Sequence, residues 1–93
     1  MAVQIDHDAD HTRYVIVLDD EPIGEAVYHD SGEGRIFTHT EITPELTSRG
    51  YGTQLVRAAL DDTRSAGLKP IGQCSMVRTF LAEHPDYSGT PRR

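Results

Sequence analysis

The hydrophobic period of the chain changes once, between Pro44 and Gly50. Before Pro44, apolar and β-branched residues occur in short alternating runs that are separated by turn residues, which predicts β-strands. After Gly50, apolar residues recur every three or four positions, which predicts one long amphipathic helix. Because another strand-like run and a second helical run follow, the fold class is α/β, with helices on an antiparallel-to-mixed sheet.

The first half of the chain carries the strand pattern in residues 13–18, 23–28 and 35–42, with turns at 19–22 and 29–34. Residues 3–6 are expected to add a short edge strand, so we expect a monomer or a weak dimer. In the third strand, a period of two divides the side chains between two faces. One face is predicted to hold Ile36, Thr38, Thr40 and Ile42, and the other Phe37, His39 and Glu41.

The second half carries one long and one short helical pattern. Five residues are expected to form the buried side of the long helix: Leu55, Val56, Ala59, Leu60 and Thr63. Gly67 is expected to end this helix in the left-handed conformation. Residues 68–73 read as a returning strand, at an edge because Pro70 has no N–H to donate. Ser75 is predicted to N-cap a short C-terminal helix that runs through Glu83.

The length of 93 residues allows one domain, which we place at residues 1–87, with 88–93 as a flexible C-terminal tail. The single cysteine, Cys74, excludes an internal disulfide and a cysteine-pair metal site, and it suits a reducing compartment. The N-terminus has no signal pattern, and the longest apolar run, residues 14–18, is far too short to span a membrane. We therefore expect a cytoplasmic protein.

Charge is divided unevenly along the chain, whose formal net charge is -6. Residues 1–48 hold eleven acids and two bases, whereas residues 49–93 hold seven bases and four acids. An acidic protein does not track nucleic-acid phosphates, so nucleic-acid binding is excluded. The acidic half suggests a cationic partner and the basic half a small anion, although solvated faces would give the same pattern.

The stretch 47–53, TSRGYGT, precedes the long helix. Gly50 and Gly52 permit a sharp turn and a close approach by a ligand. The free N–H groups of the first helical turn, together with the helix dipole, favour an anion such as phosphate. The stretch lacks the third glycine of the dinucleotide fingerprint and the Gly-Lys-Ser/Thr ending of the Walker motif.

A strand, then Arg49-Gly-Tyr-Gly52, then an amphipathic helix is an order that resembles the acetyl-CoA signature of the GNAT superfamily of N-acetyltransferases. Four further segments, in the same order, are similar to the small YjdJ-type GNAT-like proteins: 39–42 (HTEI), 67–69 (GLK), Cys74 and 84–87 (HPDY). The resemblance covers about residues 10–87. Thr47 and Ser48 stand where the superfamily usually has Gln or Arg and then Gly.

The resemblance implies a minimal GNAT-like fold that binds acetyl-CoA and passes its acetyl group to an amine, expected to be a protein or a polyamine-like cation. It implies a pyrophosphate site at Arg49, Gly50, Tyr51, Gly52 and Thr53. Thr40 and Ile42 would line the pantetheine arm. His84 and Tyr87 would contact the coenzyme or supply an acid, or would simply pack the end of the chain. A non-catalytic coenzyme A binding module and a protein-interaction domain are the alternatives.

Three residues are candidates for catalysis: Cys74, Glu41 and His39. Glu41 and His39 share a strand face about 6.5–7 Å apart, so either could take the proton of the amine. Cys74 precedes a predicted helix, whose dipole favours a thiolate that would accept acetyl or only contact the thioester. The alternatives are an exposed carboxylate for Glu41, a structural residue beside Phe37 for His39 and a packed side chain for Cys74.

Two histidines near the N-terminus, His7 and His11, have the i, i+4 spacing at which histidines on a helix chelate a metal. No helical periodicity accompanies them, so we interpret this segment as a solvated loop and expect no metal site.

Overall fold

A computed structural model describes residues 2–87. The predicted tail, 88–93, lies outside the described residues. Five strands form one sheet in the order β1-β2-β3-β4-β5: β1 (Val3–Asp8), β2 (Arg13–Leu18), β3 (Glu21–Ser31), β4 (Gly34–Ile42) and β5 (Lys69–Gly72). The first four strands pair antiparallel and β5 pairs parallel to β4, which confirms the antiparallel-to-mixed sheet.

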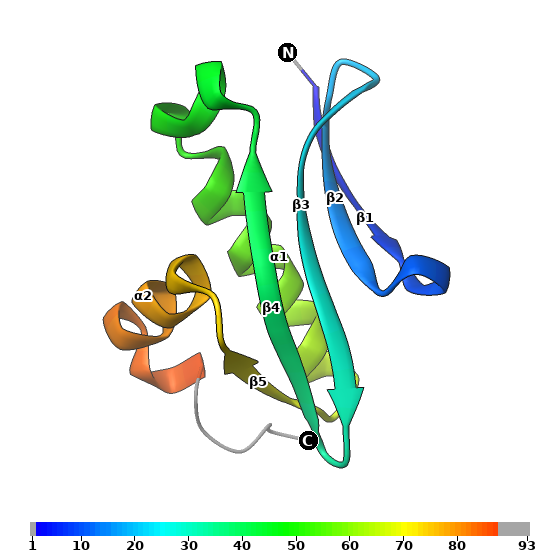
Figure 1. Cartoon of the computed structure of the whole chain (residues 1–93), viewed down its shortest axis with the longest axis vertical. Coiled ribbons are helices and arrows are strands. Elements are labelled where there is room, and N and C mark those ends of the chain that lie inside the picture. Colours follow the sequence, from blue (N-terminus) through cyan, green and yellow to red (C-terminus); the bar gives the residue numbers. More distant parts are fainter. Residues whose placement is uncertain (1, 88–93) are drawn as a thin grey trace.

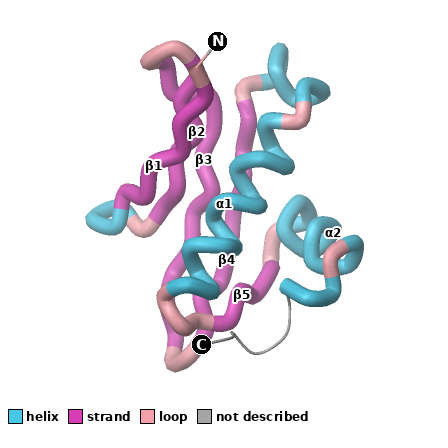
Figure 2. The backbone as a smooth tube through the Cα atoms, turned by 180° about the vertical axis from the view of Figure 1, so that it is seen from behind, coloured by secondary structure: helices cyan, strands magenta, loops and turns pink. Residues whose placement is uncertain are grey.

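Two α-helices accompany the sheet, α1 (Tyr51–Ser65) and α2 (Ser75–Glu83). The long helix α1 crosses one face of the sheet, and α2 lies beside β5 and α1 (Figures 1 and 2). Short 3₁₀ helices occupy Ala9–His11, Pro44–Arg49 and Pro85–Tyr87. The Pro44–Arg49 helix was not predicted. Pro44 lies in its first turn, where proline is favoured.

The core lies between α1 and the sheet. The five residues predicted for the buried side of the long helix are all buried in α1. They pack against sheet residues that include Tyr14, Ile16, Ala26 and Phe37. Gly67 has φ +81° just after the helix, as predicted. None of the helices in residues 2–87 has the length and apolar character needed to cross a bilayer.

The strands are longer than the pattern indicated and their turns are tighter. Asp19 and Asp20 alone form the first turn, both with positive φ, and Pro22 lies inside β3 opposite Val17. Two residues with positive φ match the twist of a hairpin, and aspartate tolerates that conformation. The prediction of a four-residue turn at 19–22 was therefore wrong.

The alternation along β4 is interrupted by a bulge at Thr38. Val27 of β3 pairs with His39 and Tyr28 pairs with Phe37, so Thr38 is an extra residue. One extra residue inverts the alternation, and both Phe37 and Ile42 are buried on the α1 side. The predicted division of faces was wrong here, because Phe37 and His39 lie on opposite sides of the sheet, and the alternative that placed His39 beside Phe37 is excluded.

The segment around His7 is part of the sheet. His7 lies in β1 opposite Tyr14, and its ring stacks on the Tyr14 ring with the centroids 4.3 Å apart. The interpretation of this segment as a solvated loop was therefore wrong for His7. His11 lies in an exposed 3₁₀ turn, so the two histidines do not share a helix face.

Candidate functional site

The start of α1 leaves backbone donors free. Gly50 has φ +81° and ψ 4°, which turns the chain from the Pro44–Arg49 helix into α1. Gly50, the N-cap residue, has no side chain that could cap this end, and the first helical hydrogen bond runs from the Gln54 N–H to the Gly50 carbonyl. The N–H groups of the first turn therefore remain available to an anion, as the sequence predicted.

The glycines of the turn differ in their surroundings. A Cβ on Gly50 would meet no heavy atom within 4 Å, so the backbone conformation alone favours glycine there. A Cβ on Gly52 would lie 3.0 Å from the sulfur of Met76, so glycine lets α1 and α2 approach closely. Arg49 and Thr53 are exposed on either side, whereas Tyr51 is buried. The Thr47 hydroxyl donates to the Pro44 carbonyl.

The second part of the candidate site is the edge of β4. The pairing of β4 with β5 ends at Phe37 and Gly72, where the Phe37 carbonyl accepts hydrogen bonds from the N–H groups of Gln73 and Cys74. Beyond this point the two strands separate (Figure 1). Among residues 2–87, no strand pairs with Thr38–Ile42 on that side. An extended ligand can therefore bond to this backbone edge.

Cys74 lies where the strands separate. It is half-buried, precedes the first residue of α2 and takes the N-cap position with extended backbone angles. The prediction of Ser75 as the N-cap was wrong by one residue. The Thr40 hydroxyl lies 3.2 Å from the Cys74 sulfur, so the structure brings a predicted pantetheine residue and a predicted catalytic residue together.

His39 and Glu41 lie on the opposite side of β4, on the sheet face that α1 does not cover. His39 Nε2 lies 3.2 Å from Glu41 Oε1, which confirms that the two share a face. Both side chains are exposed. Glu41 pairs across the strands with Glu25, which accepts a hydrogen bond from Arg13 Nη1 at 3.0 Å. The structure therefore groups the two candidate bases with Glu25 and not with Cys74.

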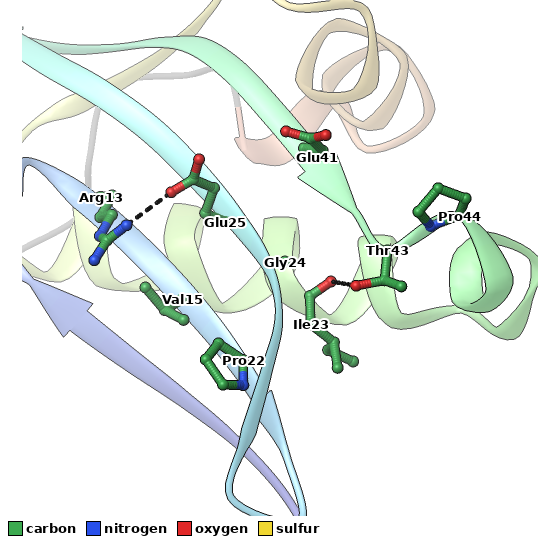
Figure 3. Close-up of a pocket in the computed structure, with 9 residues that line it drawn as sticks. All are labelled: Arg13, Val15, Pro22, Ile23, Gly24, Glu25, Glu41, Thr43 and Pro44. Atoms are coloured by element: carbon green, nitrogen blue, oxygen red, sulfur yellow. Dashed lines mark hydrogen bonds and ion pairs between the residues drawn. The ribbon is translucent and has the colours of Figure 1, made fainter.

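A pocket of about 410 Å³ opens on this face between β2, β3 and β4 (Figure 3). Its lining residues are Arg13, Val15, Pro22, Ile23, Gly24, Glu25, Glu41, Thr43 and Pro44. Glu25 was not predicted as a site residue. Its position opposite Glu41 depends on the β3–β4 register, which neither strand reveals alone.

The two residues predicted near the C-terminal end pack against α2. The His84 ring stacks on Phe80 with the centroids 4.1 Å apart, and its Nδ1 bonds to the Phe80 carbonyl. Tyr87 is buried edge-on to Phe80, and its pKa is raised, first by a hydrogen bond with Asp61. The contacts found for both residues are those of the packed chain end that was the alternative to coenzyme binding.

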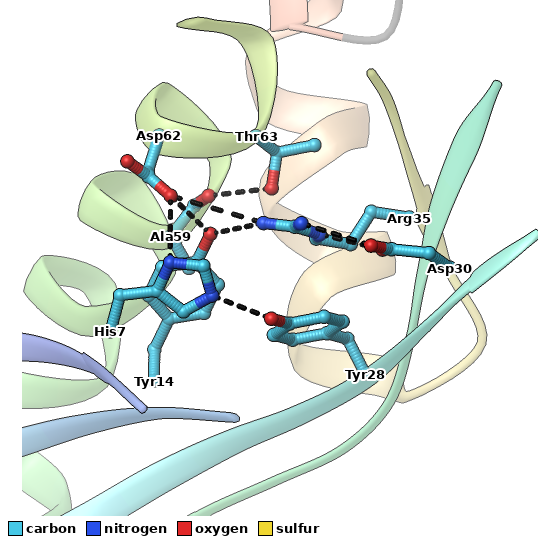
Figure 4. A network of polar contacts seen from close by, with 8 residues as sticks. All are labelled: His7, Tyr14, Tyr28, Asp30, Arg35, Ala59, Asp62 and Thr63. Carbon is cyan, nitrogen blue, oxygen red and sulfur yellow. Dashed lines mark hydrogen bonds and ion pairs between the residues drawn. The ribbon is translucent and has the colours of Figure 1, made fainter. Parts of the chain in front are cut away.

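A polar network beneath the helix was not predicted (Figure 4). The Tyr14 hydroxyl donates to Asp62 Oδ2 of α1 at 2.6 Å and accepts from Arg35 Nη1 at 2.6 Å. Arg35 is 7% exposed and also donates to Asp30. Burial, more than its hydrogen bond to Asp62, raises the pKa of Tyr14 far above its ordinary value. The network connects the sheet to α1 and positions no predicted site residue.

These geometries can be compared with known proteins. A family model described as GCN5-related N-acetyl-transferase matches residues 13–90. The chain belongs to this family. It is therefore an acetyltransferase by family, with the GNAT fold that the sequence predicted. A search of curated proteins found no match.

Solved structures share this fold. A GCN5-like protein from Staphylococcus aureus, solved by NMR, matches with a TM-score of 0.69 and 23% identity, covering 90% of this chain and 82% of that one. The ribosomal-protein-S18-alanine N-acetyltransferase from Escherichia coli matches with a TM-score of 0.64 and 12% identity over 76% of this chain and 48% of that one. The N-acetylglutamate synthase from Neisseria gonorrhoeae, complexed with coenzyme A and N-acetyl-glutamate, matches with a TM-score of 0.65 and 18% identity. This match covers 81% of this chain and 19% of that one. The chain thus spans less than half of the latter two proteins.

Proposed function

We infer that this GNAT protein is an acetyl-CoA-dependent N-acetyltransferase whose coenzyme lies along one continuous edge of the fold. The carrying observation is that only the Pro44–Arg49 3₁₀ helix separates the start of α1 from the end of β4, whose outer edge carries no strand partner beyond Phe37 among residues 2–87. One part of this edge offers amide donors to an anion, and the other offers an extended hydrogen-bonding edge.

The residues present fit the parts of acetyl-CoA. The N–H groups that follow Gly50 suit the pyrophosphate, with Arg49 and Thr53 exposed beside them. The backbone of Thr40–Ile42 suits the amide-rich pantetheine arm. The coenzyme supplies a thioester carbonyl, at which a C–N bond to the amine forms while the C–S bond breaks and the coenzyme A thiol leaves.

The chain's own residues would move the proton of the amine. A protonated amine has no lone pair for attack, so a base must take one proton before the C–N bond forms. Glu41 and His39, 3.2 Å apart, offer a carboxylate and an imidazole to hold it. Cys74, beside Thr40, would contact the thioester end of the coenzyme or accept its acetyl group.

One observation favours a second candidate, a coenzyme A binding module without turnover. Cys74 lies on the α1 side of β4 with Thr40, whereas His39 and Glu41 lie on the other face. No hydrogen bond joins Cys74 to either residue within residues 2–87. In this alternative the domain would bind acetyl-CoA without a base aligned to the thioester.

Calorimetric titration with acetyl-CoA, followed by release of free coenzyme A in the presence of amines, tests both candidates. We expect wild type to bind acetyl-CoA and to release coenzyme A, and Glu41→Gln to bind acetyl-CoA but to lose most of the release. Cys74→Ala should abolish release if Cys74 accepts the acetyl group, and should only reduce it if Cys74 merely contacts the thioester. Glu33→Gln, in the β3–β4 turn, removes the same charge far from β4's outer edge and serves as the control. Absence of binding at millimolar acetyl-CoA contradicts both candidates, and binding without turnover on any amine supports the second.

A further inference from the structure

Two carboxylates face each other across the uncovered side of the sheet. Glu25 of β3 and Glu41 of β4 are direct cross-strand partners, an arrangement that destabilises a sheet when both residues carry the same charge. Arg13 offsets part of this repulsion from the Glu25 side, with 3.0 Å between Nη1 and Oε1. In residues 2–87, Glu41 has no ion pair with a lysine or arginine, only its contact with His39. A further cation would relieve the repulsion that remains.

The spacing of the polar atoms suits an ammonium group. One ligand atom each of Glu25, His39 and Glu41 lies within 4.8 Å of the others. Acceptors at about 2.9 Å from a tetrahedral ammonium nitrogen lie roughly 4.7 Å apart, so a separation of up to 4.8 Å leaves room for an ammonium group between Glu25 and Glu41. His39 Nε2, 3.2 Å from Glu41 Oε1, lies on the Glu41 side of that position. The charge of Arg13, which is paired with Glu25, favours a monovalent over a divalent cation here.

The pocket beside these carboxylates also has an apolar side. Figure 3 shows the carboxylates of Glu25 and Glu41 on one side of the pocket and the Pro22 and Ile23 side chains on the other. Val15 and Pro44 add further apolar lining. A ligand that matches both sides has a charged end and a chain of methylene groups, as an alkylammonium does.

The surrounding face extends this charge pattern beyond the pocket. Asp6 of β1 pairs with Val15 of β2, which pairs with Glu25, so Asp6 lies in the same cross-strand row as Glu25 and Glu41. Asp8 of β1 pairs with Arg13 in the neighbouring row on the same face. No described helix covers this face, which is broad and open (Figure 1). A free small amine would bury little surface here, whereas a polypeptide could cover the face and place basic residues near these aspartates.

We propose that the pocket between β2, β3 and β4 binds the lysine side chain of a partner polypeptide, with its ammonium group between Glu25 and Glu41 and its methylene groups against Val15, Pro22 and Pro44. This proposal rests on the proposed function, for which it names the acceptor class. It gives Glu25 the role of binding the acceptor, while Glu41 and His39 are placed to receive the proton.

Titrations of the ¹⁵N-labelled protein, followed by amide chemical shifts, test the proposal. The probe is a blocked peptide with one lysine among neutral residues, and its controls are the same peptide with norleucine, 1,5-diaminopentane, and zinc or magnesium chloride. We expect the lysine peptide to shift the amides of Val15, Glu25 and Glu41, and the norleucine peptide to leave them unchanged. Glu25→Gln should weaken lysine-peptide binding about fivefold or more, and Glu33→Gln should not. Binding should also weaken as salt is raised.

Several results would overturn the proposal. These are equal binding of the norleucine peptide, shifts that map away from the pocket, no effect of Glu25→Gln, diamine binding as tight as that of the peptide, or shifts caused by the metal salts alone. The same spectra report acetyl-CoA separately, through the amides of Gly50–Thr53. If the lysine peptide binds and acetyl-CoA does not, the proposed function fails and the lysine pocket stands. If acetyl-CoA binds and the lysine peptide does not, the lysine pocket fails and the proposed function stands.

Discussion

The Tyr14 hydroxyl offers a direct test of the polar network beneath α1. It donates to Asp62 and accepts from Arg35, each at 2.6 Å, and the Tyr14 and Arg35 side chains are both buried. Tyr14→Phe keeps the ring and removes only the oxygen. Arg35 Nη1 then loses a buried acceptor, whereas Asp62, with a half-exposed side chain, can bond to water instead. A lost hydrogen bond to a charged buried group costs about 1.5–3 kcal/mol, so we expect a loss of about 2 kcal/mol.

Urea and thermal unfolding, followed by circular dichroism, measure this loss. For a domain of this size, about 2 kcal/mol corresponds to a fall of roughly 8–16 °C in Tm. Tyr51→Phe is the matched control, because the Tyr51 ring is also buried and its hydroxyl makes no hydrogen bond within residues 2–87. We expect that control to change the free energy of unfolding by less than about 0.5 kcal/mol.

A double-mutant cycle shows whether the cost comes from the guanidinium. In an Arg35→Met background no buried cation is left without its acceptor, so Tyr14→Phe should cost less than half as much as in wild type. The reasoning is refuted if Tyr14→Phe costs no more than Tyr51→Phe, or if its cost is the same with and without Arg35.

Three further changes have defined expectations. Gly24→Ala places a Cβ 2.4 Å from Ile42 Cδ1 and 2.7 Å from a main-chain oxygen of β4, so thermal melts should show a loss of about 1–3 kcal/mol. Gly50→Ala meets no atom but must hold φ +81°, so the same melts should show a loss of about 1 kcal/mol. The Arg35 hydrogen bond lowers the pKa of Asp30 below its ordinary 3.8, so this pair contributes stability above that pH and loses it as the pH falls further. Tm of wild type should therefore fall between pH 5 and pH 2, and by less in Asp30→Asn, and equal slopes would contradict this.

The hydrophobic pattern predicted the helices and strands well, because the strand period of two and the helix period of 3.6 each depend on which residues of one segment are buried. Every apolar position assigned to the long helix is buried, and Gly67 ends that helix as expected. The turn at Gly50 and the edge position of β5 were also predicted, from residues that act locally through backbone conformation or a missing N–H.

The features that the sequence did not predict depend on a partner elsewhere in the chain. The stacking of His7 on Tyr14 requires the β1–β2 register, and the pairing of Glu25 with Glu41 requires the β3–β4 register. A single strand contains no signal for either. The turn of the candidate site was therefore predicted, because neighbours in sequence form it. On the open face the sequence predicted that His39 and Glu41 share a side, and it missed Glu25, which only the strand register places opposite Glu41.

The bulge in β4 has a consequence for how such a fold can change. Thr38 stands one residue beyond Phe37, where pairing with β5 ends, and its hydroxyl bonds to the Val27 carbonyl. Because bulges bend the strand that carries them, Thr38 turns the last part of β4 away from the β5 side of the sheet. Deleting Thr38 would leave the same side chains inside and outside but straighten the strand. A one-residue insertion could thus open a continuous sheet in a single evolutionary event, without exchanging any residue of the core.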